Sequence, residues 1–324
     1  MAEGDSSINR MDAIGGYFEL ELRKGEHYHK NAIRLNTARN CFEYVLRTRK
    51  YVKVYVPYYT REVVLEPICK LGVKYEFYHI NEKLEPTALP NLNANEAFLY
   101  TNYFGLKQGF VNRLALVYGK QLIVDNAQAF YSEPLGGIDT FYSARKFFGV
   151  PDGAYLYTDK PLQQEFEQDY SYERMFHLLK RIDIGAEEGY QDFHKNDDAL
   201  CNQEIKRMSK LTEAILAGID YEAAKNRRKE NYQQLDAALG RTNQIHLDMD
   251  KDCAPMVYPY LTEDVSLKQR LIDNKVFVAT YWPNVLEWCE EVNIEHFVAK
   301  NSCFLPIDQR YGETEMRKII ELIN

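Results

Sequence analysis

The sequence predicts an α/β protein in which a large domain, with a mainly parallel sheet flanked by helices, precedes a smaller C-terminal α+β domain. Between residues 53 and 157, short apolar or β-branched runs alternate with stretches of helical character. Runs such as LIV at 122–124 are apolar throughout, which is typical of strands buried on both faces. The length of 324 residues exceeds one ordinary core and suits two domains.

Six short runs are the expected strands of the large sheet. They are VKVYV ahead of Pro57, YEFYH (75–79), AFLYT (97–101), QLIVD (121–125), DTFYS (139–143) and AYLYT (154–158). The part from about 198 to 239 has few helix breakers and predicts two helices that meet near Gly218 and Asp220. We therefore expect a large domain over residues 1–218 and a small one over 219–324.

Two further parts of the chain have clear local patterns. Apolar residues recur at helical spacing from Ala38 to Leu46, which predicts a helix that begins near Thr37, with Asn36 or Thr37 as its N-cap. Beyond Gly240 the expected elements are a strand MVYPYL (256–261), a helix over about 265–274, a strand VFVAT (276–280) and a terminal helix from about Glu313.

Composition narrows the possible functions. A formal charge of −8 disfavours nucleic acid as a partner, and no apolar run approaches the roughly 18 residues of a membrane span. The six cysteines and seven histidines show no metal-ligand spacing, so no metal site is expected, and HYH (27–29) is expected at the surface. The start of the chain has no signal-peptide pattern, and we expect a cytoplasmic protein that acts on small molecules.

Asp125 and Lys146 are the candidate chemical groups. Asp125 ends the run QLIVD, and Lys146 follows the run DTFYS, so both should lie at strand ends where open α/β sheets place ligand-contacting groups. Each signal is weak alone, because an Asp there is usually a turn residue and a lysine is usually a solvated charge. Their order after the helix at Thr37 favours a shared crevice.

Five segments in one order resemble segments of a known family. They are LNTARNCFEYVL with Asn36 in the place of a glycine, VPYYTREVVLEPICKLG, DNAQAF, KFFGVPDGA, and IKRMSKLTEAILAGID followed by YEAAKNRRKENYQQL. The chain thereby resembles the DegT/DnrJ/EryC1/StrS family, the sugar-nucleotide branch of the fold-type I enzymes that use pyridoxal 5'-phosphate (PLP). The resemblance covers nearly the whole length.

The resemblance implies a fold-type I PLP-transferase with a sheet of the seven-stranded type, and it implies roles for several residues. Lys146 would hold PLP as a Schiff base, and Asp125 would pair with the pyridine nitrogen. The other expected cofactor-binding residues are Thr37 and Ala38 at the phosphate, Gln128 near the phenolic oxygen, Ser143, and Tyr59 as one of the aromatic residues that could stack on the ring (Tyr58 and Tyr103 are the others). A homodimer is also implied.

Three positions depart from the family pattern. Arg61 stands where an aromatic residue usually stacks on the cofactor, Asn102 replaces a histidine, and Ile205 replaces an asparagine. For Arg207, Arg227 and Arg228 a solvated helix face is at least as plausible as a phosphate or substrate role. The segment TYWP (280–283) is either core packing or part of the site.

The expected activity is transfer of an amino group from an amino acid, with glutamate as the expected donor, to a keto sugar that is linked to a nucleotide. The first alternative is a PLP-dependent lyase or dehydratase; sugar dehydratases that resemble this family carry histidine in place of the lysine, so Lys146 favours transamination. The second alternative is a catalytically inactive PLP-fold binding protein, which the three departures would suit.

Overall fold

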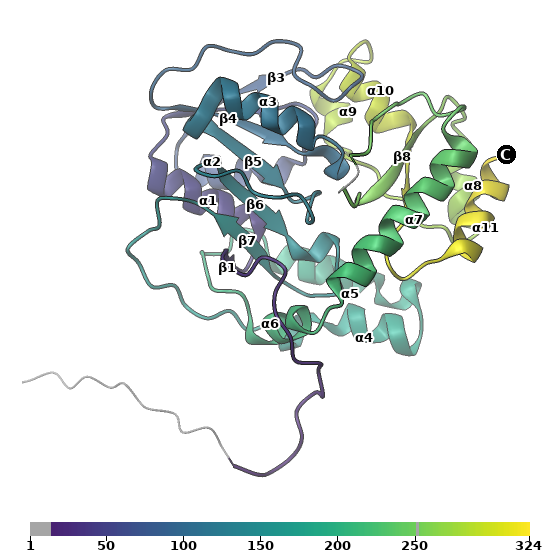
Figure 1. Ribbon diagram of the computed structural model, residues 1–324, viewed down its shortest axis with the longest axis horizontal. Coiled ribbons are helices and arrows are strands. Elements are labelled where there is room, and N and C mark those ends of the chain that lie inside the picture. Colours follow the sequence, from purple (N-terminus) through teal and green to yellow (C-terminus); the bar gives the residue numbers. More distant parts are fainter. Residues whose placement is uncertain (1–13, 251–252) are drawn as a thin grey trace, which may run out of the picture.

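A seven-stranded sheet lies at the centre of the N-terminal two thirds of the computed structural model, which describes residues 14–250 and 253–324 (Figure 1). Its strands are β1 (Ile33–Leu35), β2 (Lys53–Pro57), β3 (Lys74–Tyr78), β4 (Glu96–Thr101), β5 (Leu122–Asn126), β6 (Asp139–Ser143) and β7 (Ala154–Tyr157). They lie in the order β1-β7-β6-β5-β4-β2-β3. The pairs among β2 to β6 are parallel, and β7 runs antiparallel to both β6 and β1.

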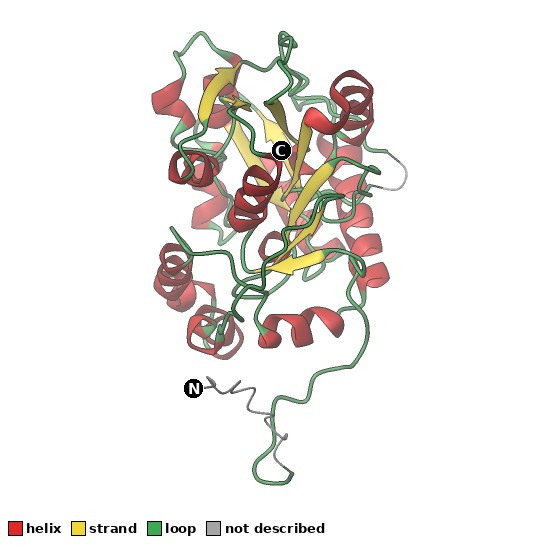
Figure 2. Cartoon of the chain, turned by 90° about the vertical axis from the view of Figure 1, so that its left-hand side faces the viewer, coloured by secondary structure: helices red, strands yellow, loops and turns green. Residues whose placement is uncertain are grey.

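Helices cover both faces of this sheet (Figure 2), which explains why its strands are apolar throughout. Alternate residues of β4 point to opposite cores: Ala97 and Leu99 pack with α1 (Ala38–Arg49), whereas Phe98 and Tyr100 pack on the other side with α3 (Gln108–Tyr118). The short α2 (Leu65–Lys70) packs beside α1. The predicted fold class and the six predicted strands are confirmed; β1 was not predicted, because three residues carry no readable alternation.

A helical hairpin follows β7. It consists of α4 (Phe176–Asp183) and α5 (Ala186–Ala199), and α6 (Lys210–Ala217) and α7 (Tyr221–Leu239) come next. The meeting of two helices near Gly218 and Asp220 is confirmed, since Asp220 caps α7 by accepting from the Ala223 N–H at 3.0 Å. The hairpin was not predicted.

The C-terminal part contains a two-stranded antiparallel sheet of β8 (Val257–Leu261) and β9 (Ser302–Pro306). Its helices are α8 (Leu267–Asp273), α9 (Val285–Trp288), α10 (Ile294–Asn301) and α11 (Glu313–Ile323), and α7 extends from the large sheet to α11 (Figure 1). The expected strand VFVAT is wrong: in this stretch only Ala279 forms a bridge, to Phe304 of β9. The unpredicted β9 occupies the pairing edge of β8 instead. The boundary between residues 218 and 219 stays a prediction.

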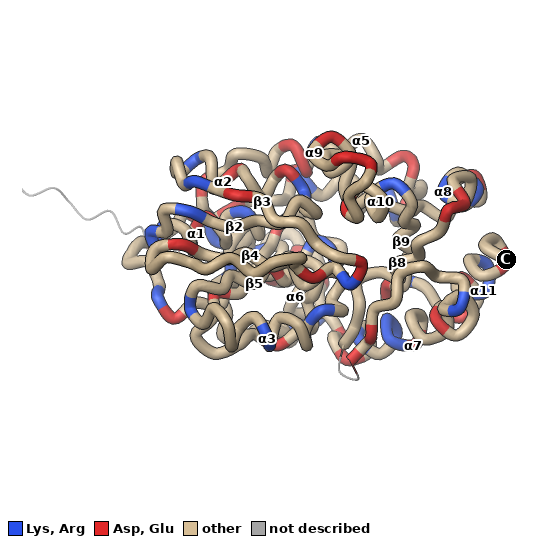
Figure 3. Tube along the Cα trace, turned by 90° about the horizontal axis from the view of Figure 1, so that it is seen from above, with Lys and Arg blue, Asp and Glu red and all other residues tan. Residues whose placement is uncertain are grey.

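Charges of both signs are spread over the molecule (Figure 3). No helix among the described residues is both long enough and apolar enough to cross a membrane. Within the same residues no group of three His, Cys, Asp or Glu side chains is placed to hold a metal ion.

The surface position expected for HYH is wrong, because His27 and His29 are buried, with 7% and 2% of their surfaces exposed. His27 Nδ1 lies 2.6 Å from the Tyr155 hydroxyl, and His29 Nε2 lies 2.9 Å from the Phe130 carbonyl oxygen. Burial lowers the pKa of each imidazole to about 4. Neutral histidines therefore fasten the segment before β1 to the aromatic core under the sheet.

These buried histidines predict acid sensitivity. The imidazole of His29 takes up a proton near pH 6.5 in the unfolded chain but only near pH 4 in the folded one, so its stabilising effect is present above pH 6.5 and is lost as the pH falls. Within that window His29 should contribute a slope of about 1.4 kcal/mol per pH unit. Urea unfolding from pH 7 to 4 should show a shallower loss for His29→Gln, while the exposed His246→Gln should follow the wild type. Equal slopes for wild type and His29→Gln would contradict the prediction.

Candidate active site

One cavity lies at the carboxyl ends of the parallel strands. Thr101, Asp125 and Ser143, from the ends of β4, β5 and β6, line it together with the N-terminus of α1. Its empty volume is about 830 Å³, including the part open to solvent, which lies in the usual range of ligand pockets. This is the edge at which open α/β sheets bind ligands.

The cavity brings together most of the residues proposed from the sequence. Its lining includes Thr37, Ala38, Asp125, Gln128, Ser143 and Lys146. Tyr59 is fully buried and does not belong to this lining. The roles of all seven residues stay predictions, but six of them now face one space.

The N-terminus of α1 forms one wall. Thr37 is the N-cap, as expected, and its hydroxyl oxygen accepts from the Asn40 N–H at 3.1 Å. The preceding residue, Asn36, accepts at its carbonyl from the Gly153 N–H at 2.6 Å and donates its own N–H to the Lys206 carbonyl at 3.0 Å. The first N–H groups of a helix have no partner within it, so those of Ala38 and Arg39 suit an anion such as phosphate.

Gly153 makes this close approach possible. Its φ of +110° is a backbone conformation that favours glycine, and an added Cβ would lie 2.9 Å from Thr212 Cγ2. The turn after Lys146 is thereby held against the start of α1.

Asp125 and Lys146 interact electrostatically across the cavity. Burial raises the pKa of Asp125, and the Lys146 ammonium and the Ala127 N–H, 2.8 Å from Oδ1, offset part of this rise. Burial lowers the pKa of Lys146, which Asp125 opposes and Arg61 and Arg145 reinforce. The Lys146 side chain is exposed where it faces the cavity, but the protein groups around the cavity still reduce the hydration of its charge.

Gln128 lines the same cavity and has an unused donor. Its Oε1 accepts from the Phe104 N–H at 2.9 Å, which fixes the amide orientation. Its Nε2 is buried and has no hydrogen-bond partner among the described residues. An unpaired buried donor costs about 1–3 kcal/mol, so an acceptor on a ligand is expected here.

Trp282 lines the cavity, as do Phe42 and Phe141. Trp282 packs against Tyr59 with ring centroids 5.1 Å apart, so Tyr59 lies behind it. Tyr103 in turn contacts Tyr59, donating its hydroxyl to the Tyr59 carbonyl at 2.9 Å. Of the two interpretations of TYWP, the structure places Trp282 in the site, whereas the expected contact of Tyr59 with the cofactor stays untested.

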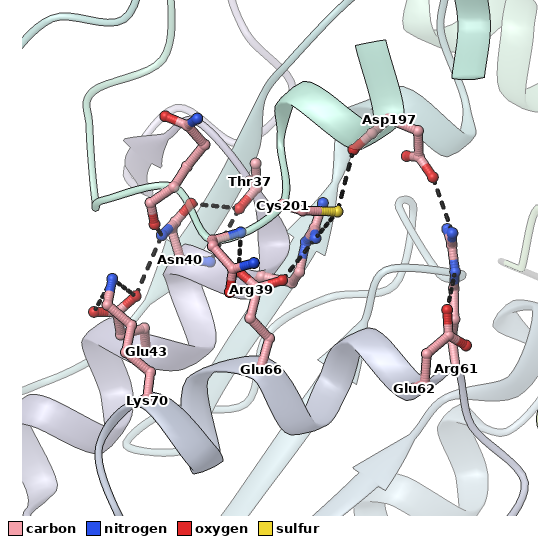
Figure 4. A network of polar contacts seen from close by, with 12 residues as sticks. Thr37, Arg39, Asn40, Glu43, Arg61, Glu62, Glu66, Lys70, Asp197 and Cys201 are labelled. Carbon is pink, nitrogen blue, oxygen red and sulfur yellow. Dashed lines mark hydrogen bonds and ion pairs between the residues drawn. The ribbon is translucent and has the colours of Figure 1, made fainter. Parts of the chain in front are cut away.

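An Arg–Asp–Arg cluster closes the rim of the cavity. Asp197 of α5 accepts from Arg61 at 2.9 Å (Figure 4) and from Arg145 at 3.2 Å. Burial would raise the pKa of Asp197, but Arg145 and Arg61 outweigh it and hold that pKa below its usual range. Arg61, which replaces the aromatic residue of the family pattern, thus ties the helical hairpin to the sheet.

A second group of contacts in Figure 4 fixes the chain after α5. Arg39 donates to Glu66 of α2 at 2.8 Å and to Cys201 Sγ at 3.3 Å. Asn40 donates to the Gln203 carbonyl at 2.9 Å. The sequence did not single out Asp197, Arg145 or Arg39, because these residues lie far apart along the chain and their contacts cannot be read from a local pattern.

The three arginines left open by the sequence have different surroundings. Arg207 is exposed and lies in a different surface hollow beside β1. Arg227 is exposed and pairs with Glu230 at 2.9 Å. The solvated-face interpretation is wrong for Arg228, which is only 1% exposed.

Comparison with known proteins identifies the fold. By sequence, the chain matches no protein-family model and no curated protein. By structure it is similar to the aminotransferase TlmJ from Streptoalloteichus hindustanus, with a TM-score of 0.63 and 16% identity over 90% of this chain and 84% of that one. It is also similar to a DegT DnrJ EryC1 StrS aminotransferase from Brucella abortus, with a TM-score of 0.59, 16% identity and coverages of 90% and 84%.

A dehydratase has the same architecture. GDP-4-keto-6-deoxymannose-3-dehydratase (ColD) gives a TM-score of 0.60 at 12% identity, over 90% of this chain and 88% of that one. At these identities the likeness concerns the fold. The chain has fold type I of the PLP-dependent enzymes, in the form found in sugar aminotransferases of the DegT/DnrJ/EryC1/StrS type, as the resemblance predicted.

The Coulomb interaction between Asp125 and Lys146 gives a prediction with a definite sign. The carboxylate raises the pKa of the Lys146 amine, so Asp125→Asn should lower that pKa further below its ordinary value. In protein without cofactor, labelling of Lys146 with an amine reagent across pH, read by mass spectrometry, should therefore show its midpoint at lower pH in the variant. A midpoint that stays in place or rises would mean that the two groups do not sense each other.

Proposed function

We propose that this protein is a PLP-dependent aminotransferase that moves an amino group from an amino acid, with glutamate as the expected donor, to a keto sugar carried by a nucleotide. The observation that carries the proposal is the single cavity in which Lys146, Asp125, the Gln128 amide and a helix N-terminus meet. The fold shared with sugar aminotransferases supports it.

The residues present fit PLP on chemical grounds. A free donor on Gln128 suits the phenolic oxygen, the first N–H groups of α1 suit the phosphate, and Ser143 can add a hydroxyl there. When bound, PLP supplies an aldehyde that exchanges amino groups and a protonated ring that withdraws electrons from the neighbouring carbon. Trp282 provides an aromatic surface in the same cavity.

Lys146 has two tasks in this proposal. Its amine would hold the cofactor, and when not attached to it the amine would take up and return the proton of the substrate carbon. A lowered pKa serves both tasks, because a larger fraction of the amine is then neutral near pH 7 to 8. Asp125 would hold the ring nitrogen protonated, and this positive charge would oppose the rise that burial imposes on the pKa of Asp125.

The dehydratase alternative has support from the shared fold of ColD. The two activities place different requirements on residue 146. Sugar dehydratases that resemble this family carry histidine there, whereas the Lys146 amine permits covalent attachment of the cofactor. Transamination of glutamate yields 2-oxoglutarate, whereas dehydration of the sugar does not, so detection of this product separates the two activities. The third possibility, an inactive binding protein, would yield neither 2-oxoglutarate nor a dehydrated sugar.

The homodimer and the cytoplasmic location stay predictions. Several apolar side chains of the α4–α5 hairpin, among them Ile182, Ile184 and Tyr190, are exposed in the single chain, which supports burial against a second copy. Sedimentation equilibrium of the purified protein should give twice the mass of one chain.

Lys146→Ala and Asp125→Asn test the catalytic assignment. Lys146→Ala should lose the visible absorbance of the covalently held cofactor and fall in rate by at least about a thousandfold, because both tasks of the amine are lost. Asp125→Asn should keep the fold and covalent attachment but lose most of the rate, since an amide cannot hold the ring nitrogen protonated. Borohydride reduction in the presence of PLP should mark Lys146; persistent marking of another lysine in Lys146→Ala would refute this assignment.

A further inference from the structure

Arg228 of α7 is a fully buried arginine, with 1% of its surface exposed. It lies where the C-terminal part of the chain packs against the part that contains the large sheet. Its Nε donates to Gln309 Oε1 at 2.9 Å, Nη1 to the Met256 carbonyl at 3.1 Å, and Nη2 to the Phe147 carbonyl at 3.2 Å. The guanidinium also lies 4.6 Å from the centroid of the Phe147 ring. Each of the three guanidinium nitrogens thus donates to a residue distant in sequence.

The contacts with Phe147 reach the residue next to Lys146. The Phe147 carbonyl accepts both from Arg228 and from Gln309 Nε2, the latter at 2.8 Å. Gln309 therefore serves twice, because it orients Arg228 and shares its acceptor. Two donors from the C-terminal part of the chain thus fix the Phe147–Phe148 peptide unit, which begins at the residue next to Lys146.

A second branch leads from Arg228 to Gln128. Met256, whose carbonyl accepts from Arg228, donates its N–H to the Phe104 carbonyl at 2.9 Å, and the Phe104 N–H donates to Gln128 Oε1. Phe104 has a φ of +57°, an unusual conformation for a residue with a side chain. A residue keeps such a backbone conformation where the surrounding structure holds it. Here the hydrogen bonds of the Phe104 N–H to Gln128 and of the Phe104 carbonyl to Met256 hold the backbone on both sides of the residue.

We propose that Arg228 is a positioning residue of this site, which holds the Lys146 backbone through Phe147 and the Gln128 amide through Met256 and Phe104. This inference rests on the proposed function only for the identity of the cofactor. Arg228 does not line the cavity. It acts by keeping the Lys146 amine and the Gln128 donor at a constant separation.

Arginine suits this position better than lysine. Three acceptors lie in different directions around one planar group, which a guanidinium can serve and a single ammonium cannot. Burial lowers the pKa of Arg228 to about 10, while the nearby Asp308 carboxylate opposes the shift, so the side chain stays charged near neutral pH.

The test uses Arg228→Met, Arg228→Lys and Gln309→Leu, with Arg227→Met as the matched control. Arg227 is the adjacent residue on α7, but it is exposed and pairs only with Glu230 in the contacts described. Gln309→Leu removes the 2.8 Å donor to Phe147 and leaves Arg228 buried, so it serves if Arg228→Met does not fold. Thermal unfolding identifies the folded variants.

Two measurements are made on each folded variant. In cofactor-free protein, the pH midpoint for amine labelling of Lys146 should rise toward 10.5, because a less constrained amine gains hydration. In the PLP-loaded enzyme, kcat should fall about tenfold or more while KM for the amino donor changes less than about twofold, because misplacement affects reaction more than binding. Arg228→Lys should fall between wild type and Gln309→Leu, and Arg227→Met should match the wild type in both.

The outcomes separate this inference from the proposed function. If the labelling midpoint moves in Gln309→Leu but wild type takes up no PLP, the positioning stands and the aminotransferase proposal fails. Suppose instead that the wild type transaminates, and that folded Gln309→Leu and Arg228→Lys keep the wild-type labelling midpoint and a kcat within about twofold of the wild-type value. The positioning role is then overturned.

Discussion

The structure of this site depends on one constraint: an amine and a carboxylate from successive strand ends share a cavity in which the charged form of each group is less well hydrated than in water. Each moderates the pKa shift that burial imposes on the other. The parallel arrangement of β4, β5 and β6 produces this pairing, because it brings the carboxyl ends of all three strands to one edge of the sheet. The helix N-terminus of α1 adds an anion site at the same edge.

Three separate parts of the chain hold this edge. The Gly153 turn and residue Lys206 fasten the start of α1 through Asn36. The α4–α5 hairpin reaches the rim through Asp197. The C-terminal part reaches the back through Arg228 and Gln309. The cavity is therefore supported by long-range polar contacts, which explains how a site built on loops and strand ends can keep its geometry.

Departures from the family pattern have structural consequences rather than leaving gaps. Arg61 replaces an aromatic residue, and it forms an ion pair with Asp197 while Trp282 supplies an aromatic surface from a distant segment. Asn102 replaces a histidine and orders the following turn, accepting from the Lys107 N–H at 2.9 Å. Arg61 also helps to lower the pKa of Lys146.

The sequence alone determined the α/β class, six of the seven strands of the main sheet, and the candidates Asp125, Lys146 and Thr37, because apolar runs, a helix cap and the order of motifs are local signals. Only the tertiary structure decided that Trp282 rather than Tyr59 lines the cavity, that Asp197 reaches its rim, that His27 and His29 are buried, and that β9 instead of VFVAT pairs with β8. These facts depend on which segments distant along the chain lie side by side, and the side-chain pattern within one segment carries no record of its partner. Arg228 shows the difference most clearly: its neighbour Arg227 has the same side chain one position away, yet the rotation of about 100° between successive helix residues sends one into solvent and the other into the core.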